Sequence, residues 1–294
     1  MSGAPAGGGN GATPVLIRHY TDPTCPFAFS AERQRLRLLW LYGEQIEWEL
    51  HVVVLTETTP DVTPEQLSKG FRRLALQYGM PIDWRERERL GPSVHACRAV
   101  VAARLRWPDR EAALMRRLRV LYFAGAPIDD SDTLELAASQ AGLPVEELAE
   151  WAAAAEVEGA MRADMAAARS PSPASRAQDY KLGGPAGERR YTCPSYELIR
   201  VGEPPADWST AGRVDLPGYR PVEAYETAIA NLAPELTRRP DPESAAEVLA
   251  WAGVPLATAE VAAVCDRDDA DVRPELARTA RFEPVGSDGY WSPA

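Results

Sequence analysis

Residues 22–29 have the sequence DPTCPFAF, and they stand between an apolar segment at 15–20 and apolar residues at helical spacing up to Leu41. This order predicts a buried strand followed by a helix. The helix is expected to begin at Pro26, because proline fits the first turn, where a missing N–H group costs nothing. Cys25 then lies at a helix N-terminus, where free N–H groups and the helix dipole favour the thiolate over the thiol.

Position 28 is alanine, where a Cys-x-x-Cys redox motif beginning at Cys25 would carry its second cysteine. The sequence therefore keeps a position for an activated thiol and lacks the partner that resolves a mixed disulfide. This excludes ordinary dithiol–disulfide cycling within one Cys-x-x-Cys motif.

The next segments complete a β–α–β unit and then open a long helical stretch. Residues 46–55 are rich in β-branched and aromatic side chains and predict a second strand, with Gly43 ending the helix before it. A parallel pair joined by one helix needs a right-handed crossover. At 63–66 the sequence TPEQ predicts a helix start with a capping box.

The rest of the chain predicts a helical block and a second half-sheet. Expected elements are helices at 94–106, 110–123, 131–141 and 145–168, a loop at 170–190, strands at 196–201 and 213–216, and a helix at 221–232. Without the helical block, this is the element order of a thioredoxin fold. The predicted domains are therefore a thioredoxin-fold domain at 14–60 and 171–235, interrupted by a helical domain at 61–170, after a flexible tail at 1–13.

A separate small module is predicted at 241–294. Helices are expected at 242–251, 257–264 and 271–281, with a hairpin at 284–291 that turns on Ser-Asp-Gly. This order resembles a winged helix, so the fold class is α/β with a winged-helix-like C-terminal module. Four arginines face eleven acidic residues in this module, a net charge of −7, which excludes phosphate-backbone binding. A packing or dimerisation role is expected, and a homodimer remains open.

Composition narrows the remaining classes of function. The net charge of −11 argues against nucleic acid or an anionic membrane surface as partner. No signal peptide or membrane-spanning run is present, so a cytoplasmic protein is expected. Cysteines 25, 97, 193 and 265 and histidines 19, 51 and 95 show no metal-ligand spacing, so neither a metal nor another cofactor is predicted.

Three motifs together carry a family resemblance. Residues 22–29 are similar to the Asp-Pro-x-Cys-Pro-Trp-x-Trp start of the first helix in the DsbA-like branch of the thioredoxin superfamily. Residues 191–196, YTCPSY, match the cis-proline loop of that family, and residues 92–99, PSVHACRA, match the start of an inserted helix. The chain looks closest to the cytosolic group that holds 2-hydroxychromene-2-carboxylate isomerases and DsbA-like oxidoreductases, with CPFA in place of CxxC, over residues 15–235.

The resemblance implies roles for individual residues. Cys25 is expected to be the catalytic thiol and His95 a base or hydrogen-bond donor, although His95 could equally be a surface residue at a helix start. Cys193 could form a disulfide with Cys25 or simply line the substrate groove. Substrate-binding roles are implied for Asp22, Pro26, Phe27, Phe29, Ser93, Thr192, Cys193, Pro194 and Tyr196, although the aromatic residues among them could belong to the core.

These expectations lead to three hypotheses about function. The first is a thiol-dependent isomerase, in which the Cys25 thiolate adds reversibly to a conjugated double bond of a small-molecule or carrier-bound substrate. The second is a thiol–disulfide oxidoreductase that pairs Cys25 with Cys193 or with a small thiol as cosubstrate. The third is a non-catalytic adaptor or binding protein.

Overall fold

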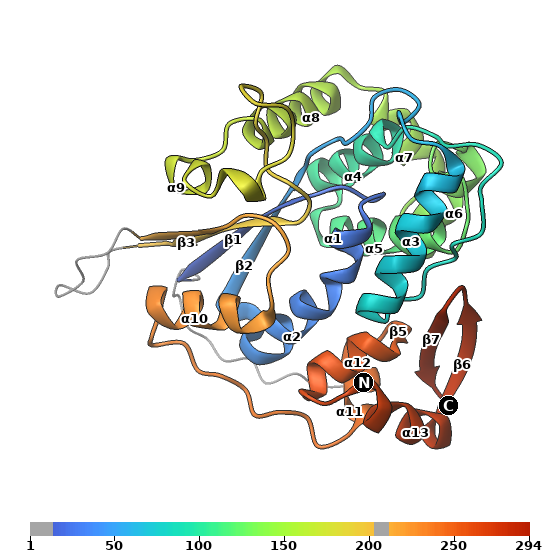
Figure 1. The fold of residues 1–294 in the computed structure, drawn as a ribbon, viewed down its shortest axis with the longest axis vertical. Helices are drawn as coiled ribbons and strands as arrows, with labels where there is room; N and C mark the ends of the chain where they lie inside the picture. Colours follow the sequence, from blue (N-terminus) through green and yellow to red (C-terminus); the bar gives the residue numbers. More distant parts are fainter. Residues whose placement is uncertain (1–13, 203–211) are drawn as a thin grey trace.

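The computed structural model describes residues 14–202 and 212–294, so the predicted tail at 1–13 lies outside the described residues. Its central sheet has the strand order β2-β1-β3-β4 (Figure 1). Strand β1 (Val15–Thr21) runs parallel to β2 (Ile46–Val52) and antiparallel to β3 (Ser195–Arg200), which pairs with β4 (Arg213–Leu216). This is the predicted thioredoxin-like arrangement, with the second strand ending three residues earlier than expected.

Helices cover both faces of this sheet. Figure 1 shows α2 (Glu32–Tyr42) and α10 (Val222–Leu232) on one face, while α8 (Ala155–Ala168) and α9 (Pro173–Arg176) lie over the other. The expected single helix from Pro26 is divided into α1 (Pro26–Ser30) and α2.

Between β2 and β3 lies the helical block. Its helices are α3 (Pro64–Tyr78), α4 (Val94–Arg106), α5 (Pro108–Phe123), α6 (Ser131–Gln140), α7 (Val145–Ala152) and α8. Thr63 and Gln66 form the predicted capping box of α3. The predicted helix at 145–168 is wrong in its continuity, because the chain becomes extended at Ala154 and separates α7 from α8. None of the described helices combines the length and apolar character needed to cross a bilayer.

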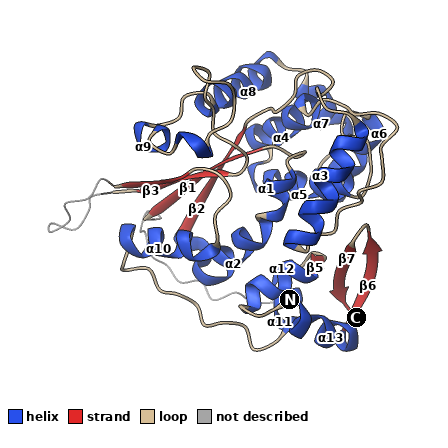
Figure 2. Cartoon of the chain, in the orientation of Figure 1, coloured by secondary structure: helices blue, strands red, loops and turns tan. Residues whose placement is uncertain are grey.

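The C-terminal module contains α11 (Ala245–Ala252), β5 (Leu256–Ala257), α12 (Thr258–Cys265), α13 (Asp269–Thr279), β6 (Ala280–Val285) and β7 (Asp288–Pro293) (Figure 2). Its sheet has the order β5-β7-β6. The short strand β5 was not predicted, and α13 ends before residue 281 because the chain enters β6. Helix α12 packs on α2, and the buried Arg37 of α2 donates to the carbonyl of Val264 at 2.6 Å, so the module is joined to the thioredoxin-like part.

The core has three apolar clusters. One fills the helical block, and a second joins the sheet face under α2 and α10 to the C-terminal module. The third is small and surrounds Cys25 and Cys193 with Tyr20, Leu182 and Tyr191. The two cysteines therefore lie together in a separate small apolar cluster at the end of the sheet.

Candidate active site

Cys25 is the N-cap residue of α1, as the sequence predicts. Its backbone is extended, with φ −78° and ψ 114°, and Pro26 begins the helix. The side chain is 6% exposed, and the Cys25 thiol donates to the carbonyl oxygen of Cys193 over 3.1 Å. The thiol thus sits between the start of a helix and the loop that precedes β3.

The two thiols of Cys25 and Cys193 interact directly, and this sets their order of ionisation. A hydrogen bond from the Cys193 thiol and the backbone N–H groups of Ala28 and Phe27 lower the pKa of Cys25, against the opposing effects of burial and of the Asp22 carboxylate. Burial and the neighbouring Cys25 sulfur raise the pKa of Cys193 well above that of an ordinary thiol. Cys25 is therefore the thiol that ionises first, and both cysteines are free thiols in this structure.

The loop that carries Cys193 is fixed by hydrogen bonds on both sides. The Cys193–Pro194 peptide bond is cis. Thr192 donates from its hydroxyl to the carbonyl of Lys181 at 2.9 Å, and Ser195 donates to the carbonyl of Thr192 at 2.7 Å. The N–H of Gly218 then donates to the Ser195 hydroxyl at 3.0 Å. The position of Cys193 is therefore determined by contacts on either side of it.

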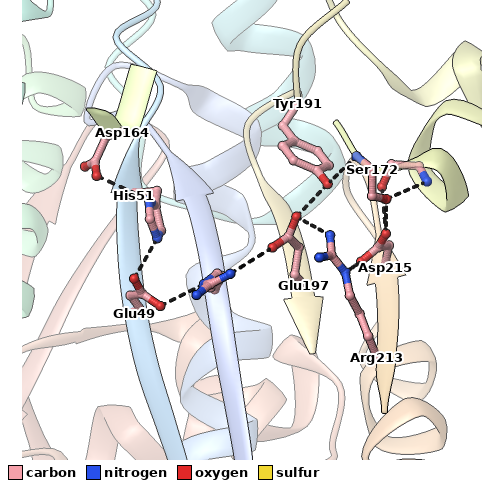
Figure 3. A network of polar contacts seen from close by, with 10 residues as sticks. Glu49, His51, Asp164, Ser172, Tyr191, Glu197, Arg213 and Asp215 are labelled. Carbon is pink, nitrogen blue, oxygen red and sulfur yellow. Dashed lines mark hydrogen bonds and ion pairs between the residues drawn. The ribbon is translucent and has the colours of Figure 1, made fainter. Parts of the chain in front are cut away.

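A polar network anchors the same loop to the sheet (Figure 3). The Tyr191 hydroxyl donates to Glu197 at 2.6 Å and accepts from the backbone N–H of Ser172 at 3.1 Å. The Ser172 hydroxyl donates to Asp215, and Arg213 binds both Glu197 and Asp215. Buried Tyr191 therefore fixes the chain two residues before Cys193.

The network continues across the sheet into the helical block (Figure 3). Arg18 binds Glu49 at 2.8 Å and lies 3.9 Å from Glu197 on the other side. His51 contacts Glu49 at 3.0 Å and Asp164 of α8 at 3.2 Å. Three strands and α8 are thus held in register beneath the loop.

Asp22 is a fully buried carboxylate that joins the start of α1 to the start of α4. One oxygen accepts from the backbone and hydroxyl of Thr24, at 2.8 and 2.6 Å. The other accepts from Leu55 N–H at 2.8 Å, from the Ser93 hydroxyl at 2.7 Å and from the Cys97 thiol at 3.5 Å. Five donors, all neutral, therefore stabilise one buried charge.

Backbone strain occurs beside this carboxylate. Val54 has φ +52°, a conformation that β-branched residues rarely adopt. It lies directly before Leu55, whose N–H group donates to Asp22. Strained backbone of this kind is concentrated at functional sites, where the surrounding contacts hold it in place.

Comparison with known proteins identifies the family of this chain. The model of the DSBA-like thioredoxin domain matches residues 16–172, more than half of the 294 residues. The chain belongs to the DSBA-like thioredoxin domain family. A comparison with curated protein sequences gave no match.

Several solved structures share the fold of this DSBA-like protein. A protein assigned as a disulfide isomerase from Nitrosomonas europaea is 15% identical, with TM-score 0.54 and coverage of 74% of this chain and 96% of the other. A probable DsbA oxidoreductase from Streptomyces coelicolor is 20% identical, with TM-score 0.54 and coverage of 77% and 93%. The cytosolic disulfide reductase DsbM from Pseudomonas aeruginosa is 19% identical, with TM-score 0.51 and coverage of 75% and 93%.

The DSBA-like fold brings together only part of the predicted site. Cys25, Cys193 and Pro194 meet, and Thr192 and Pro26 lie partly exposed next to them in the chain. Phe27 is 36% exposed and packs edge-on against Tyr78, with 6.4 Å between ring centroids. These residues form the accessible side of the thiol site.

Four predicted substrate contacts belong instead to the interior of this DSBA-like protein. Asp22 and Ser93 are fully buried and bind each other. Phe29 stacks on Phe123 in the core of the helical block, and Tyr196 stacks on His19 beneath the sheet. All four side chains are therefore buried, and each contacts other residues of the protein interior; their role in substrate binding stays a prediction.

The structure does not bring His95 to the thiol. Ser93 and Cys97 are four residues apart on α4, and both face Asp22. His95 lies two residues after Ser93, about 200° around the helix, so it faces away from Asp22. It is exposed and lines a hollow with residues of α6 and α7. The geometry therefore gives His95 no part in the chemistry of Cys25.

Sequence reasoning missed the residues that hold the site in place. Tyr191, Glu197 and Asp215 are buried next to the cis-proline loop. Tyr191 donates to Glu197, and Arg213 binds both Glu197 and Asp215. Glu197 had a detectable signal, since a charged residue within the apolar strand at 196–201 requires a buried partner. No cluster of three or more potential metal ligands occurs among the residues that the structure describes.

Proposed function

We propose that this DSBA-like protein catalyses thiol–disulfide exchange with Cys25 as the nucleophile and Cys193 as the resolving thiol. The observation that carries the proposal is the contact of the Cys25 thiol with the Cys193 carbonyl at 3.1 Å within one small apolar cluster, together with the mutual influence of the two thiols on their pKa values. Family membership supports thiol chemistry in general. The contact between Cys25 and Cys193 supports exchange rather than another thiol reaction.

In the proposed reaction, a substrate disulfide oxidises the two cysteines and is itself reduced to two thiols. The Cys25 thiolate attacks one sulfur of a substrate disulfide, forms a mixed disulfide and releases the other sulfur as a thiolate, which takes up a proton. Cys193 then loses its proton and attacks the Cys25 sulfur, which releases the second substrate thiol. The substrate gains two electrons, and the protein keeps a Cys25–Cys193 disulfide that a small thiol reduces.

The position of Cys193 compensates for the alanine at position 28. Ala28 is fully buried in α1, so a resolving thiol has to come from another segment. The carbonyl of Cys193 already accepts from the Cys25 thiol at 3.1 Å, and its side chain is in contact as well. A thiol on the cis-proline loop therefore takes the place of the second cysteine of a Cys-x-x-Cys motif.

Mass spectrometry of the reduced protein treated with 2-hydroxyethyl disulfide tests this function. Wild type should lose two hydrogens and give a cross-linked peptide pair that contains Cys25 and Cys193. Cys193→Ser should stop at a stable mixed disulfide on Cys25. The control Cys265→Ser changes a buried cysteine of the C-terminal module and should behave as wild type. A wild type that also stops at the mixed disulfide contradicts the proposal.

Thiol-dependent isomerisation is a second candidate, and one observation favours it. The exposed Phe27 ring borders Cys25 and packs against Tyr78, which gives a flat apolar surface for a conjugated substrate. A single thiolate would be sufficient for reversible addition to a double bond. The Cys193→Ser variant separates the two functions, because isomerisation of a conjugated acid, followed by NMR, should survive it and exchange should not.

A further inference from the structure

A second polar site lies inside the protein, apart from the thiol site. A cavity of about 60 Å³ is lined by residues of β1, β2, α2 and α5. It therefore lies where the sheet meets the helical block. Its polar lining residues include His19, Trp48, Glu111, Arg116 and Arg119.

Each of these five residues has a buried polar atom with no hydrogen-bond partner among the described residues. The atoms are His19 Nε2, Trp48 Nε1, Glu111 Oε1, Arg116 Nε and Arg119 Nε. Buried polar groups are almost always paired, so one such atom calls for an explanation. Five such atoms on residues that line a single cavity point to a polar group inside it.

The charges around the cavity favour an anion. Arg116 is paired with the buried Glu260 at 2.7 Å, and Arg119 is paired with Glu32. Glu32 also lies 3.7 Å from Arg35, whose guanidinium stacks over the Trp48 ring at 5.4 Å. Glu49, which also lines the cavity, is paired with Arg18 at 2.8 Å. With Glu111 protonated, the three guanidinium groups of Arg35, Arg116 and Arg119 therefore share the two carboxylates of Glu32 and Glu260, which leaves one positive charge. A buried charge without a counterion is costly.

We propose that this cavity binds a small monovalent oxyanion of the size of formate. Such an ion supplies acceptors for the three N–H groups of Trp48, Arg116 and Arg119, which can only donate. Neutral His19 donates from Nε2 in one of its tautomers, and burial keeps its pKa well below the ordinary value. The volume of about 60 Å³ fits a group of only a few atoms, so a small anion is favoured over a large one.

Glu111 links anion binding to protonation. Burial raises the pKa of Glu111 to about 7, against the charge of Arg104, whose Nε lies 4.0 Å from the Glu111 carboxylate. In its protonated form, Glu111 donates to an anion. In its ionised form, the Glu111 carboxylate itself balances the positive charge of the site and repels an added anion. Binding should therefore be accompanied by proton uptake at Glu111.

Other groups face Glu111 from the elements packed around it. Asp164 of α8 adds a negative charge, while Arg35 of α2 and His51 of β2 add positive ones. His51 is a second titratable group: burial lowers its pKa, but Asp164 and Glu49 outweigh this effect and raise the pKa above its ordinary value. A test of the linkage therefore has to separate Glu111 from His51.

The expected pH effect follows from the pKa of Glu111. With a value of about 7, roughly nine-tenths of the carboxyl is protonated at pH 6 and roughly one-tenth at pH 8. The apparent dissociation constant for formate should therefore be about tenfold lower at pH 6 than at pH 8. Formate itself stays ionised over this range.

Thermal unfolding in sodium formate measures this constant, because a ligand of the folded state raises the midpoint in a saturable way. Ionic strength is kept constant with sodium gluconate, an anion too large for the cavity. Formate should stabilise wild type in a saturable way. The formate concentration that gives half of the full effect should be about tenfold lower at pH 6 than at pH 8. Equal midpoints in formate and gluconate would mean that water alone fills the cavity, and would overturn the proposal.

Three variants assign the effect to residues. Glu111→Gln keeps the size of the side chain and should bind formate equally at both pH values, whereas His51→Gln should retain the tenfold difference. A pH dependence that is lost in His51→Gln and kept in Glu111→Gln overturns the assignment to Glu111. Glu135→Gln, an exposed change on α6, is the matched control and should behave as wild type.

Discussion

The starts of α1 and α4 face the same buried carboxylate, and each carries a cysteine. The pKa values of these two cysteines are shifted in opposite directions. At the start of α1, hydrogen bonding lowers the pKa of Cys25. At the start of α4, burial and the charge of Asp22 raise the pKa of Cys97 well above the ordinary value. Both helices begin within hydrogen-bonding distance of Asp22, through Thr24 and Ser93.

The difference lies in which backbone groups face the sulfur. Cys25 is the N-cap residue, so free N–H groups of the first turn point to its side chain. Cys97 lies one turn inside α4, where its own N–H group is already bonded to the Ser93 carbonyl at 2.9 Å. Its thiol donates to Asp22, and hydrogen bonds from Ser93 and from the backbone of Val54 do not outweigh the effects of burial and of the Asp22 charge on its pKa. In this protein, the helix start therefore activates the thiol at the capping position. One turn further into the helix, the effect is lost.

The largest expected effect concerns alkylation of the two thiols. Iodoacetamide should modify Cys25 about a hundredfold faster than Cys97 at pH 7, because the thiolate is the nucleophile. The rate at Cys25 should rise with pH and reach half of its plateau at a lower pH than the rate of an ordinary free thiol, because the pKa of Cys25 is lowered. Peptide mass spectrometry at timed intervals measures both rates. Equal rates at the two cysteines would remove the distinction between the helix starts.

Asp22→Asn tests the carboxylate that the two starts share. An amide has one oxygen in place of two, so part of the set of five donors loses its acceptor, and the free energy of unfolding should fall by about 2 kcal/mol. The pKa of Cys25 should fall further, because the Asp22 charge opposes its ionisation. Urea unfolding and the pH profile of alkylation report the two effects separately. An unchanged stability would mean that Asp22 does not hold the starts of α1 and α4 together.

Variants of Cys193 separate two causes of the low pKa of Cys25: the hydrogen bond from Cys193 and the start of α1. Cys193→Ala removes the donor that contributes most to the low pKa of Cys25, so that pKa should rise and alkylation at pH 7 should slow by about fivefold. Cys193→Ser keeps a donor at this position and should stay close to wild type. Stopped-flow measurement of thiolate absorbance at 240 nm follows the pKa. The same rise in both variants would assign the shift to packing instead.

The smallest effect is expected at a third helix start, which carries no thiol. Thr63 caps α3 by accepting from Gln66 N–H at 3.2 Å, and Gln66 accepts from Thr63 N–H at 2.9 Å. Thr63→Ala should lower the free energy of unfolding by about 1 kcal/mol and leave the alkylation rate of Cys25 unchanged. Chemical denaturation measures the first value. A slower alkylation would show that the thiol site senses the stability of the helical block as a whole.

The sequence was sufficient wherever the signal is local. Pro26 after Cys25 marks the start of α1, and Thr63 with Gln66 marks the start of α3. Apolar periodicity located the strands and most helices, because burial on one face leaves a pattern in the chain. The alanine-rich break between α7 and α8 left no such signal, since alanine favours helix on both sides of Ala154.

The site residues divide in the same way. The chain alone pointed to Cys25 at a helix start, and the family resemblance pointed to the loop of Cys193, because both signals are short local features of the sequence. It could not establish that His95 faces away from the thiol or that Phe29 and Tyr196 point into the core. The direction of a side chain around a helix or across a strand depends on which neighbours pack there.

The sequence by itself determined the fold class, the thiol at the start of α1 and the missing partner at position 28. Only the tertiary structure decided that the Cys193 thiol contacts Cys25, that Asp22 joins two helix starts, and that a polar cavity lies between the sheet and α5. The physical reason is the sequence separation of the groups. Cys25 and Cys193 are 168 residues apart, and their contact arises because β3, which follows the helical block in the chain, pairs with β1.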